Sequence, residues 1–121
     1  MSYDTADYRS YTLKAATLST AATLLTVIGP KGKAGRLHDI SAVVTTETTD
    51  AATELRVGDA GDADQYGILS VAAAAVGAAS NEPTIYDTDT NQLPADTAVI
   101  IATDGGCTAG AADVVVVIAW F

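Results

Sequence analysis

The sequence predicts an all-β protein built as an antiparallel β-sandwich of about eight strands with jelly-roll-like order, or alternatively as an immunoglobulin-like sandwich. β-Branched residues dominate most of the 121-residue chain. Turn-forming residues recur about every eight to twelve positions, a spacing typical of sandwiches and barrels. Helix signals are weak, because the alanine-rich run at 71–79 contains Gly77 and shows neither an N-terminal cap nor an amphipathic stripe.

The predicted strands follow one another without an internal repeat or a linker, so we expect a single folded domain. Residues 1–10 form an extended polar arm in this interpretation, and residues 11–121 form the sandwich. A chain of this length buries about two-thirds of the surface that its unfolded form exposes, which is enough for a core. The predicted strands cover residues 11–17, 23–28, 36–45, 54–57, 66–72, 84–86, 97–103 and 113–121.

Turn residues mark the ends of these strands. The loop at 29–35 holds three glycines and a proline, and the loop at 58–65 is rich in aspartate. Residues 87–92 form a polar turn, and residues 104–113 are rich in glycine and alanine. Glycine adopts backbone angles that other residues avoid, and aspartate bonds to the backbone of its own turn, so each stretch favours a chain reversal.

The last strand is apolar on both faces. Successive side chains of a strand point to opposite sides, so one face carries Val114, Val116, Ile118 and Trp120, and the other carries Val115, Val117, Ala119 and Phe121. A two-layer sandwich buries only one face of each sheet. The second face therefore needs a cover, either from the same chain or from another subunit or partner, and we expect Val115, Val117 and Phe121 to contact that cover.

Charge is distributed unevenly along the chain. The net charge is −9, and every basic residue lies in the first 56 positions. From Val57 onward there are nine acidic residues and no lysine or arginine. Such a chain lacks the cations that grip phosphates, so we expect no nucleic-acid partner and no membrane partner.

Catalytic residues are scarce, and we expect no enzymatic activity and no cofactor. His38 is the only histidine, and no serine lies in a Gly-x-Ser-x-Gly elbow. A pair of Cys107 with His38 stays open as an alternative, because such pairs meet only in space. The simpler interpretation is a solvated or hydrogen-bonded His38 and a Cys107 held in a glycine-rich loop.

The loop at 29–35 lacks the glycine and lysine spacing of a phosphate-binding loop, and its proline removes a backbone donor. Together with Arg36, its lysines Lys31 and Lys33 make the densest positive patch of an acidic chain. This patch is either a solvated hairpin loop or a docking element for an acidic protein surface. We count Lys31, Lys33 and Arg36 as candidate partner-binding residues.

Two aspartate-rich loops raise the question of calcium. Asp59, Asp62 and Asp64 share one loop, and Asp87, Asp89 and Asn91 alternate in another. Neither matches an EF-hand, because alanine stands where the bidentate glutamate belongs in both. We predict no metal site and interpret these residues as turn-forming aspartates, with a looser calcium site as the alternative.

Three segments together resemble a known family. They are the loop and strand start Ile28-Gly29-Pro30-Lys31-Gly32-Lys33-Ala34-Gly35-Arg36, the stretch from Leu55 to Tyr66, and the stretch Leu93-Pro94-Ala95-Asp96-Thr97-Ala98-Val99 with the glycine-rich loop and last strand after it. In order and spacing they are similar to small head decoration proteins, also called cement or minor capsid proteins, of tailed bacteriophages. The resemblance covers the chain from about Ile28 onward.

This resemblance implies a structural protein on the outside of an assembled phage head, often a homotrimer, that clamps neighbouring subunits of the major capsid protein. It implies no catalytic residues. Such a protein is made in the host cytoplasm and ends up on the capsid exterior of the virion. The alternative is a tail or fibre β-sandwich module that binds carbohydrate or another virion protein.

The N-terminal arm supplies the remaining candidate contacts. Tyr3, Tyr8 and Tyr11 lie in or next to it, and tyrosine is enriched at the energetic centres of protein interfaces. We therefore expect three contact elements on a capsid surface: the arm, the loop with Lys31 to Arg36, and the outward side of the last strand.

Overall fold

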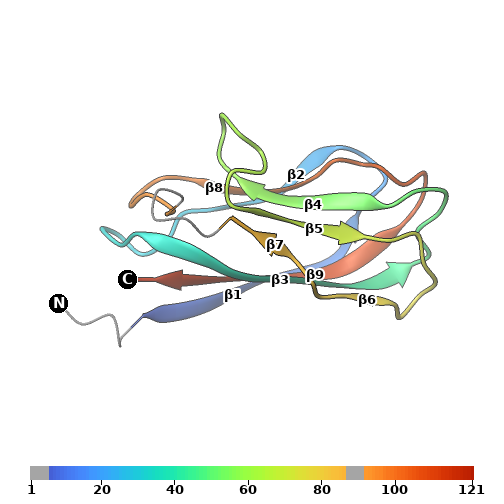
Figure 1. The fold of residues 1–121 in the computed structure, drawn as a ribbon, viewed down its shortest axis with the longest axis horizontal. Helices are drawn as coiled ribbons and strands as arrows, with labels where there is room; N and C mark the ends of the chain where they lie inside the picture. The colour runs from blue at the N-terminus through green and yellow to red at the C-terminus, as the bar shows by residue number, and fades with distance from the viewer. Residues whose placement is uncertain (1–5, 87–91) are drawn as a thin grey trace.

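The computed structural model describes residues 6–86 and 92–121, which form nine strands (Figure 1). The strands are β1 (Asp7–Thr17), β2 (Ala22–Val27), β3 (Gly35–Thr46), β4 (Thr53–Gly58), β5 (Gly67–Val71), β6 (Ala79–Ser80), β7 (Thr84–Ile85), β8 (Val99–Thr103) and β9 (Ala111–Trp120). Within the described residues, no helix is long and apolar enough to cross a membrane.

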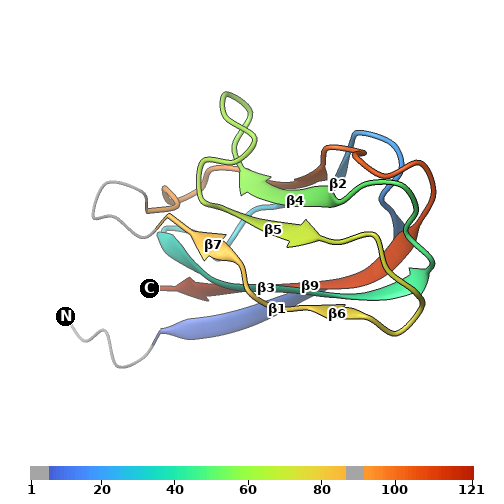
Figure 2. The same cartoon turned by 45° about the vertical axis from the view of Figure 1, so that its right-hand side comes forward.

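The strands form two antiparallel sheets that pack face to face (Figure 2). The first sheet has the order β1-β9-β3-β6, and the second has the order β2-β8-β4-β5-β7. The chain passes from one sheet to the other between β1 and β2, β2 and β3, and β3 and β4, and its last strand lies beside its first. This alternation gives the jelly-roll-like β-sandwich that the sequence predicts.

The predicted strands are present, with small differences at their ends. β1 begins at Asp7, four residues before the predicted start, so Asp7–Ser10 belong to the sheet and not to a separate arm. The two-residue strand β6 was not predicted, because it lies in the alanine- and glycine-rich stretch that carries no strand signal. It pairs with Ala42 and Val43 of β3.

The core lies between the two sheets and confirms the predicted inner face of the last strand. Val114, Val116 and Ile118 are fully buried, and Trp120 is 1% exposed. The second sheet packs against them with residues that include Leu55, Val57, Leu69, Val99 and Ile101. Each buried Val, Leu or Ile contributes about 1.5–3 kcal/mol relative to exposure, so this layer is the main source of stability.

The ring of Trp120 packs against backbone at the end of the sandwich. A Cβ atom on Gly29 would collide with the ring, and one on Gly35 would lie 2.7 Å from its Cε3. Glycine at both positions is therefore required by the close approach of the indole ring. The indole Nε1 donates a hydrogen bond of 3.0 Å to the Tyr11 hydroxyl, which satisfies the polar end of the buried ring.

The other side of the first sheet, which we call the outer face, is one surface of the molecule. β9 lies between β1 and β3, and the second sheet packs on the side of this sheet that is opposite to the outer face (Figure 2). Val115, Val117 and Phe121 are half-buried there, and Val43 on β3 is 44% exposed. Side chains of the two flanking strands thus cover β9 only in part.

Candidate functional site

The outer face is hollowed where β1 begins and β9 ends. Tyr8 of β1 and Arg36 of β3 both pair with Ala119 of β9, so the three residues form one row across the sheet. Ala119 is the small residue in the middle of this row, and its neighbours on both sides are large. A short side chain between two long ones leaves a depression above the middle strand.

This depression is a pocket of about 400 Å³, which we call the end pocket. It is lined by Ala6, Tyr8, Arg36, Gln92, Ala119 and Phe121. Tyr8 is 59% exposed, which is unusual for an aromatic side chain on a sheet. The end pocket therefore offers aromatic, cationic and amide groups to solvent within one concave site.

His38 supports one wall of the end pocket. Its ring lies edge-to-face against Tyr8, with centroids 5.0 Å apart and planes at 78°. The two rings come from β1 and β3 and approach each other across β9. Aromatic pairs of this geometry contribute about 0.5–1.5 kcal/mol beyond their buried area, so the contact restrains the otherwise exposed Tyr8.

A bulge in β3 determines where His38 points. The pairing with β9 shifts between Leu37 and Asp39, which leaves His38 as the extra residue. His38 and Asp39 therefore both lie away from the core, although adjacent residues of a regular strand face opposite sides.

The basic loop lies at the same end of the sheet as the end pocket. The Phe121 amide donates a hydrogen bond of 3.0 Å to the Ala34 carbonyl, which ties the chain after β9 to this loop. The Gly32 amide donates one of 2.9 Å to Asp96, and Lys33 closes a turn with Pro30. Lys31 and Lys33 are exposed, and within the described residues neither forms an ion pair.

The structure brings some of the predicted contact residues together and separates others. Tyr8, Arg36 and Phe121 line the end pocket, and Lys31 and Lys33 lie in the adjacent loop. Val115 and Val117 lie further along β9 on the outer face. Tyr3 lies outside the described residues.

Tyr11 lies on the inner face of β1 and not on the outer face. It pairs with Val116, packs against the core and accepts the hydrogen bond from Trp120, so it acts inside the sandwich. Tyr11 pairs with the inward-facing Val116, whereas Tyr8, three residues earlier, pairs with the outward-facing Ala119, so the two side chains lie on opposite faces of the sheet.

Three lining residues were not predicted: Ala6, Gln92 and Ala119. Ala119 carried a usable signal, because it is the one small residue in the apolar run Val114–Phe121. Gln92 carried none, since it follows a polar turn and reaches the end pocket only through the packing of distant loops. His38 was expected to be solvated or hydrogen-bonded, and it is exposed, but its contact with Tyr8 depends on the bulge.

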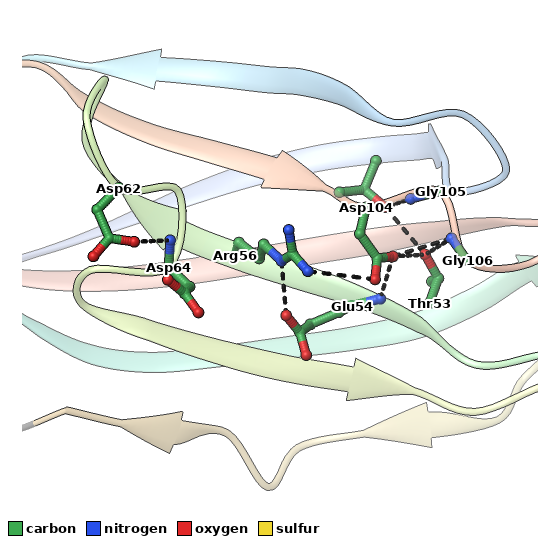
Figure 3. A network of polar contacts seen from close by, with 9 residues as sticks. Thr53, Glu54, Arg56, Asp62, Asp64, Asp104, Gly105 and Gly106 are labelled. Carbon is green, nitrogen blue, oxygen red and sulfur yellow. Dashed lines mark hydrogen bonds and ion pairs between the residues drawn. The ribbon is translucent and has the colours of Figure 1, made fainter.

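A second polar cluster joins the start of β4 to the end of β8 (Figure 3). Asp104 Oδ1 accepts hydrogen bonds from the Glu54 amide at 2.9 Å, the Gly106 amide at 3.0 Å and the Thr53 hydroxyl at 3.0 Å. Arg56 bonds to Glu54 at 2.7 Å and lies 3.7 Å from Asp104. Burial opposes ionisation of Asp104, but these hydrogen bonds and Arg56 outweigh it and lower its pKa.

We interpret the Asp104 cluster as structural and predict its effect on stability. Asp104→Ala leaves two amides without their acceptor, so the free energy of unfolding at pH 7 should fall by about 1–3 kcal/mol. Because the native pKa is lowered, the stabilising contribution is present above the unfolded pKa of about 3.9 and is lost as pH falls through the native value. Urea unfolding at pH 7 and at about pH 2 measures both effects.

Glu82→Gln is the matched control, because Glu82 is an exposed carboxylate outside this cluster. It should leave the stability at pH 7 almost unchanged. An Asp104→Ala variant that loses equal stability at both pH values would contradict the role of the ionised carboxylate.

The aspartate loop between β4 and β5 bonds to itself. Asp59 accepts hydrogen bonds from the Gly61 and Asp62 amides at 2.9 and 2.8 Å, and Asp62 accepts one from the Asp64 amide at 3.3 Å. The neighbouring Asp64 side chain raises the pKa of Asp62. These bonds confirm the interpretation as turn-forming aspartates.

Within residues 6–86 and 92–121, no group of three or more His, Cys, Asp or Glu side chains is arranged to hold a metal ion. Asp87, Asp89 and Asn91 lie outside the described residues.

His38 and Cys107 lie far apart. The Thr108 amide bonds to the Thr49 carbonyl at 3.2 Å, so the Cys107 loop sits beyond the end of β3 at Thr46. Eight residues of strand separate His38 from that end, a distance of roughly 25 Å. Cys107 is 2% exposed and packs in the core, whereas His38 is on the outer face. The alternative of a joint nucleophilic site at these two residues is therefore wrong.

No protein-family model matches the chain, and no curated protein matches it. Among solved structures, the chain is similar to a chain of the cyanophage Pam1 capsid asymmetric unit, with 21% sequence identity and a TM-score of 0.42 over 95% of this chain and 81% of that chain.

Proposed function

We propose that this chain is a non-enzymatic structural protein of a phage virion that decorates the outside of the assembled head. In this role it binds the major capsid protein and stabilises the shell by bridging capsid subunits. Each bridge contributes free energy only in the assembled shell, so bound copies favour assembly by mass action. A repeating lattice of weak sites multiplies their combined strength.

The observation that carries this proposal is the convergence of contact residues at one end of the outer face. Tyr8, Arg36 and Phe121 come from three strands or their ends and line one pocket, with Lys31 and Lys33 in the next loop. The sequence resemblance to head decoration proteins supports the proposal independently, because it rests on loop motifs and not on which side chains the structure exposes.

Self-association is the second part of the proposal. The half-buried Val115 and Val117 leave apolar surface on the outer face, and the resemblance implies a homotrimer. Native mass spectrometry of the purified chain should then give a species of three times the monomer mass of 12.2 kDa. A monomer at every concentration tested would remove the trimer from the proposal and leave the capsid contact untouched.

Virion localisation can be tested directly. Phage particles purified on a density gradient should contain this chain at a fixed ratio to the main shell protein, as measured by quantitative mass spectrometry. Heads purified from phage that lack the gene should bind the added chain on their outer surface. Particles without the chain, together with no binding to such heads, would refute the proposed function.

The basic loop provides the matched variants for this binding assay. Lys31→Glu should weaken sedimentation with heads about tenfold and reduce its salt dependence, because a rim charge mainly steers association. Lys14→Glu is the control: Lys14 is also exposed but lies near Asp113, at the other end of the outer face. Equal losses for both variants would show that net charge matters and that this loop does not.

A further inference from the structure

The end pocket combines two kinds of wall. Tyr8 and Phe121 contribute aromatic rings, and Arg36 and Gln92 contribute a guanidinium and an amide. A second pocket has a volume of about 440 Å³, and the described residues that line it include neither a ring nor a cation: Leu69, Ser70, Ala79, Ser80, Asn81 and Glu82. Pockets with apolar walls and a few polar groups are the usual form of a binding site.

We propose that the end pocket receives a carboxylate-bearing side chain of the partner protein. The apolar stem of that side chain packs against Tyr8 and Phe121, and its carboxylate meets Arg36. A guanidinium binds a carboxylate through two parallel hydrogen bonds, which adds direction as well as strength. This inference rests on the proposed function and specifies the chemistry of the surface that the chain recognises.

Charge complementarity favours an acidic occupant. Lys31 and Lys33 lie in the loop next to Arg36, so three of the six basic residues gather at this end of the molecule. The chain from Val57 to its end has nine acidic residues and no lysine or arginine. Asp96 also lies beside this loop, where it accepts a hydrogen bond from the Gly32 amide, and the three cations around it attract an acidic segment of a partner.

The end pocket is also held in shape before any partner arrives. Its floor, Ala119, is paired with strands on both sides. Tyr8 is restrained by the ring of His38, and the Phe121 amide is bonded to the Ala34 carbonyl. Groups on paired strands lose little freedom on binding, so more of the contact energy appears as affinity.

A small probe can test the end pocket without any capsid. Titration of the full chain with 3-phenylpropionate, followed by ¹H–¹⁵N NMR, should shift the amides of Tyr8, Arg36, Ala119 and Phe121. A ligand of this size binds with a dissociation constant of about millimolar. The neutral 3-phenylpropionamide should bind at least about fivefold more weakly, because it lacks the charge that Arg36 recognises.

Two variants and one control ligand test which groups of the end pocket bind the carboxylate. Arg36→Gln should weaken 3-phenylpropionate binding about fivefold or more, since it removes the charge-assisted bonds. Lys14→Gln should leave binding unchanged, because Lys14 lies at the far end of the outer face. N-Acetylglucosamine should produce no shifts at the end pocket.

Three outcomes would overturn the inference: equal binding of the amide and the carboxylate, shifts caused by the sugar alone, or no shifts with up to about 20 mM carboxylate. The sugar result would favour the tail or fibre alternative. The titration uses the isolated chain, so it separates the two proposals. Carboxylate binding by a chain that never associates with heads would reject the proposed function, whereas head binding without carboxylate binding would reject this inference.

Discussion

Trp120→Ala is expected to lower the free energy of unfolding by about 3–5 kcal/mol, the range for removal of a large buried aromatic side chain. The ring is 1% exposed and packs on Gly29 and Gly35. Neither glycine has a side chain that can move into the cavity, so the end of the sandwich cannot repack. Domains of this size are stable by only about 5–15 kcal/mol, so the loss is a large fraction of the total. Urea unfolding monitored by far-ultraviolet circular dichroism measures it.

Tyr11→Phe is the control for the polar part of this effect. It removes the acceptor of the indole hydrogen bond but keeps the ring of residue 11 in place. The expected loss is about 0.5–1.5 kcal/mol, the net contribution of one hydrogen bond. If Trp120→Ala lowers the free energy of unfolding no more than Tyr11→Phe does, packing of the indole ring does not stabilise this end of the sandwich.

Deletion of residues 1–10 is expected to destabilise the fold as well as remove Tyr8 from the end pocket. Asp7, Tyr8, Arg9 and Ser10 pair with Trp120, Ala119, Ile118 and Val117 of β9. Cross-strand pairs contribute about 0.2–1 kcal/mol each, so the four together account for about 1–4 kcal/mol. The deletion also uncovers one edge of β9, an apolar strand prone to pairing with other chains. Thermal unfolding and light scattering measure the two effects.

Deletion of residues 1–5 is the matched control, because it removes no strand pair of the described chain. The variant without residues 1–5 should melt at the same temperature as the full chain. The variant without residues 1–10 should melt at least about 5 °C lower. Equal melting temperatures for the two deletions would contradict the assignment of Asp7–Ser10 to the sheet as a stabilising element.

Much of the fold could be predicted because it depends on local patterns. The glycine, proline and aspartate turns separated the strands, and the apolar run of the last strand identified its buried face. Strand ends and the short β6 were missed, because a strand end is decided by its neighbour and two residues carry too little pattern. The bulge in β3 could not be predicted either, because one extra residue at His38 reverses the alternation that follows it and carries no local signal.

The candidate site was predicted in part. Tyr8, Arg36 and Phe121 were named as contact residues from their chemical types, but as members of three separate elements. Their convergence depends on the pairing of the first strand with the last and of β3 with β9, which spans most of the chain. Tyr11 was named as a contact residue but packs against the core, because residue type alone does not say which face of a strand it occupies.

The sequence by itself determined the fold class, the excess of acidic residues beyond Val57 and the apolar character of both faces of β9, because these follow from composition and from the two-residue period of strands. Only the tertiary structure decided that Tyr8, Ala119 and Arg36 form one row, with His38 against Tyr8. Rows across a sheet join residues that are distant in sequence, and their register is set by pairing and bulges that no local pattern records.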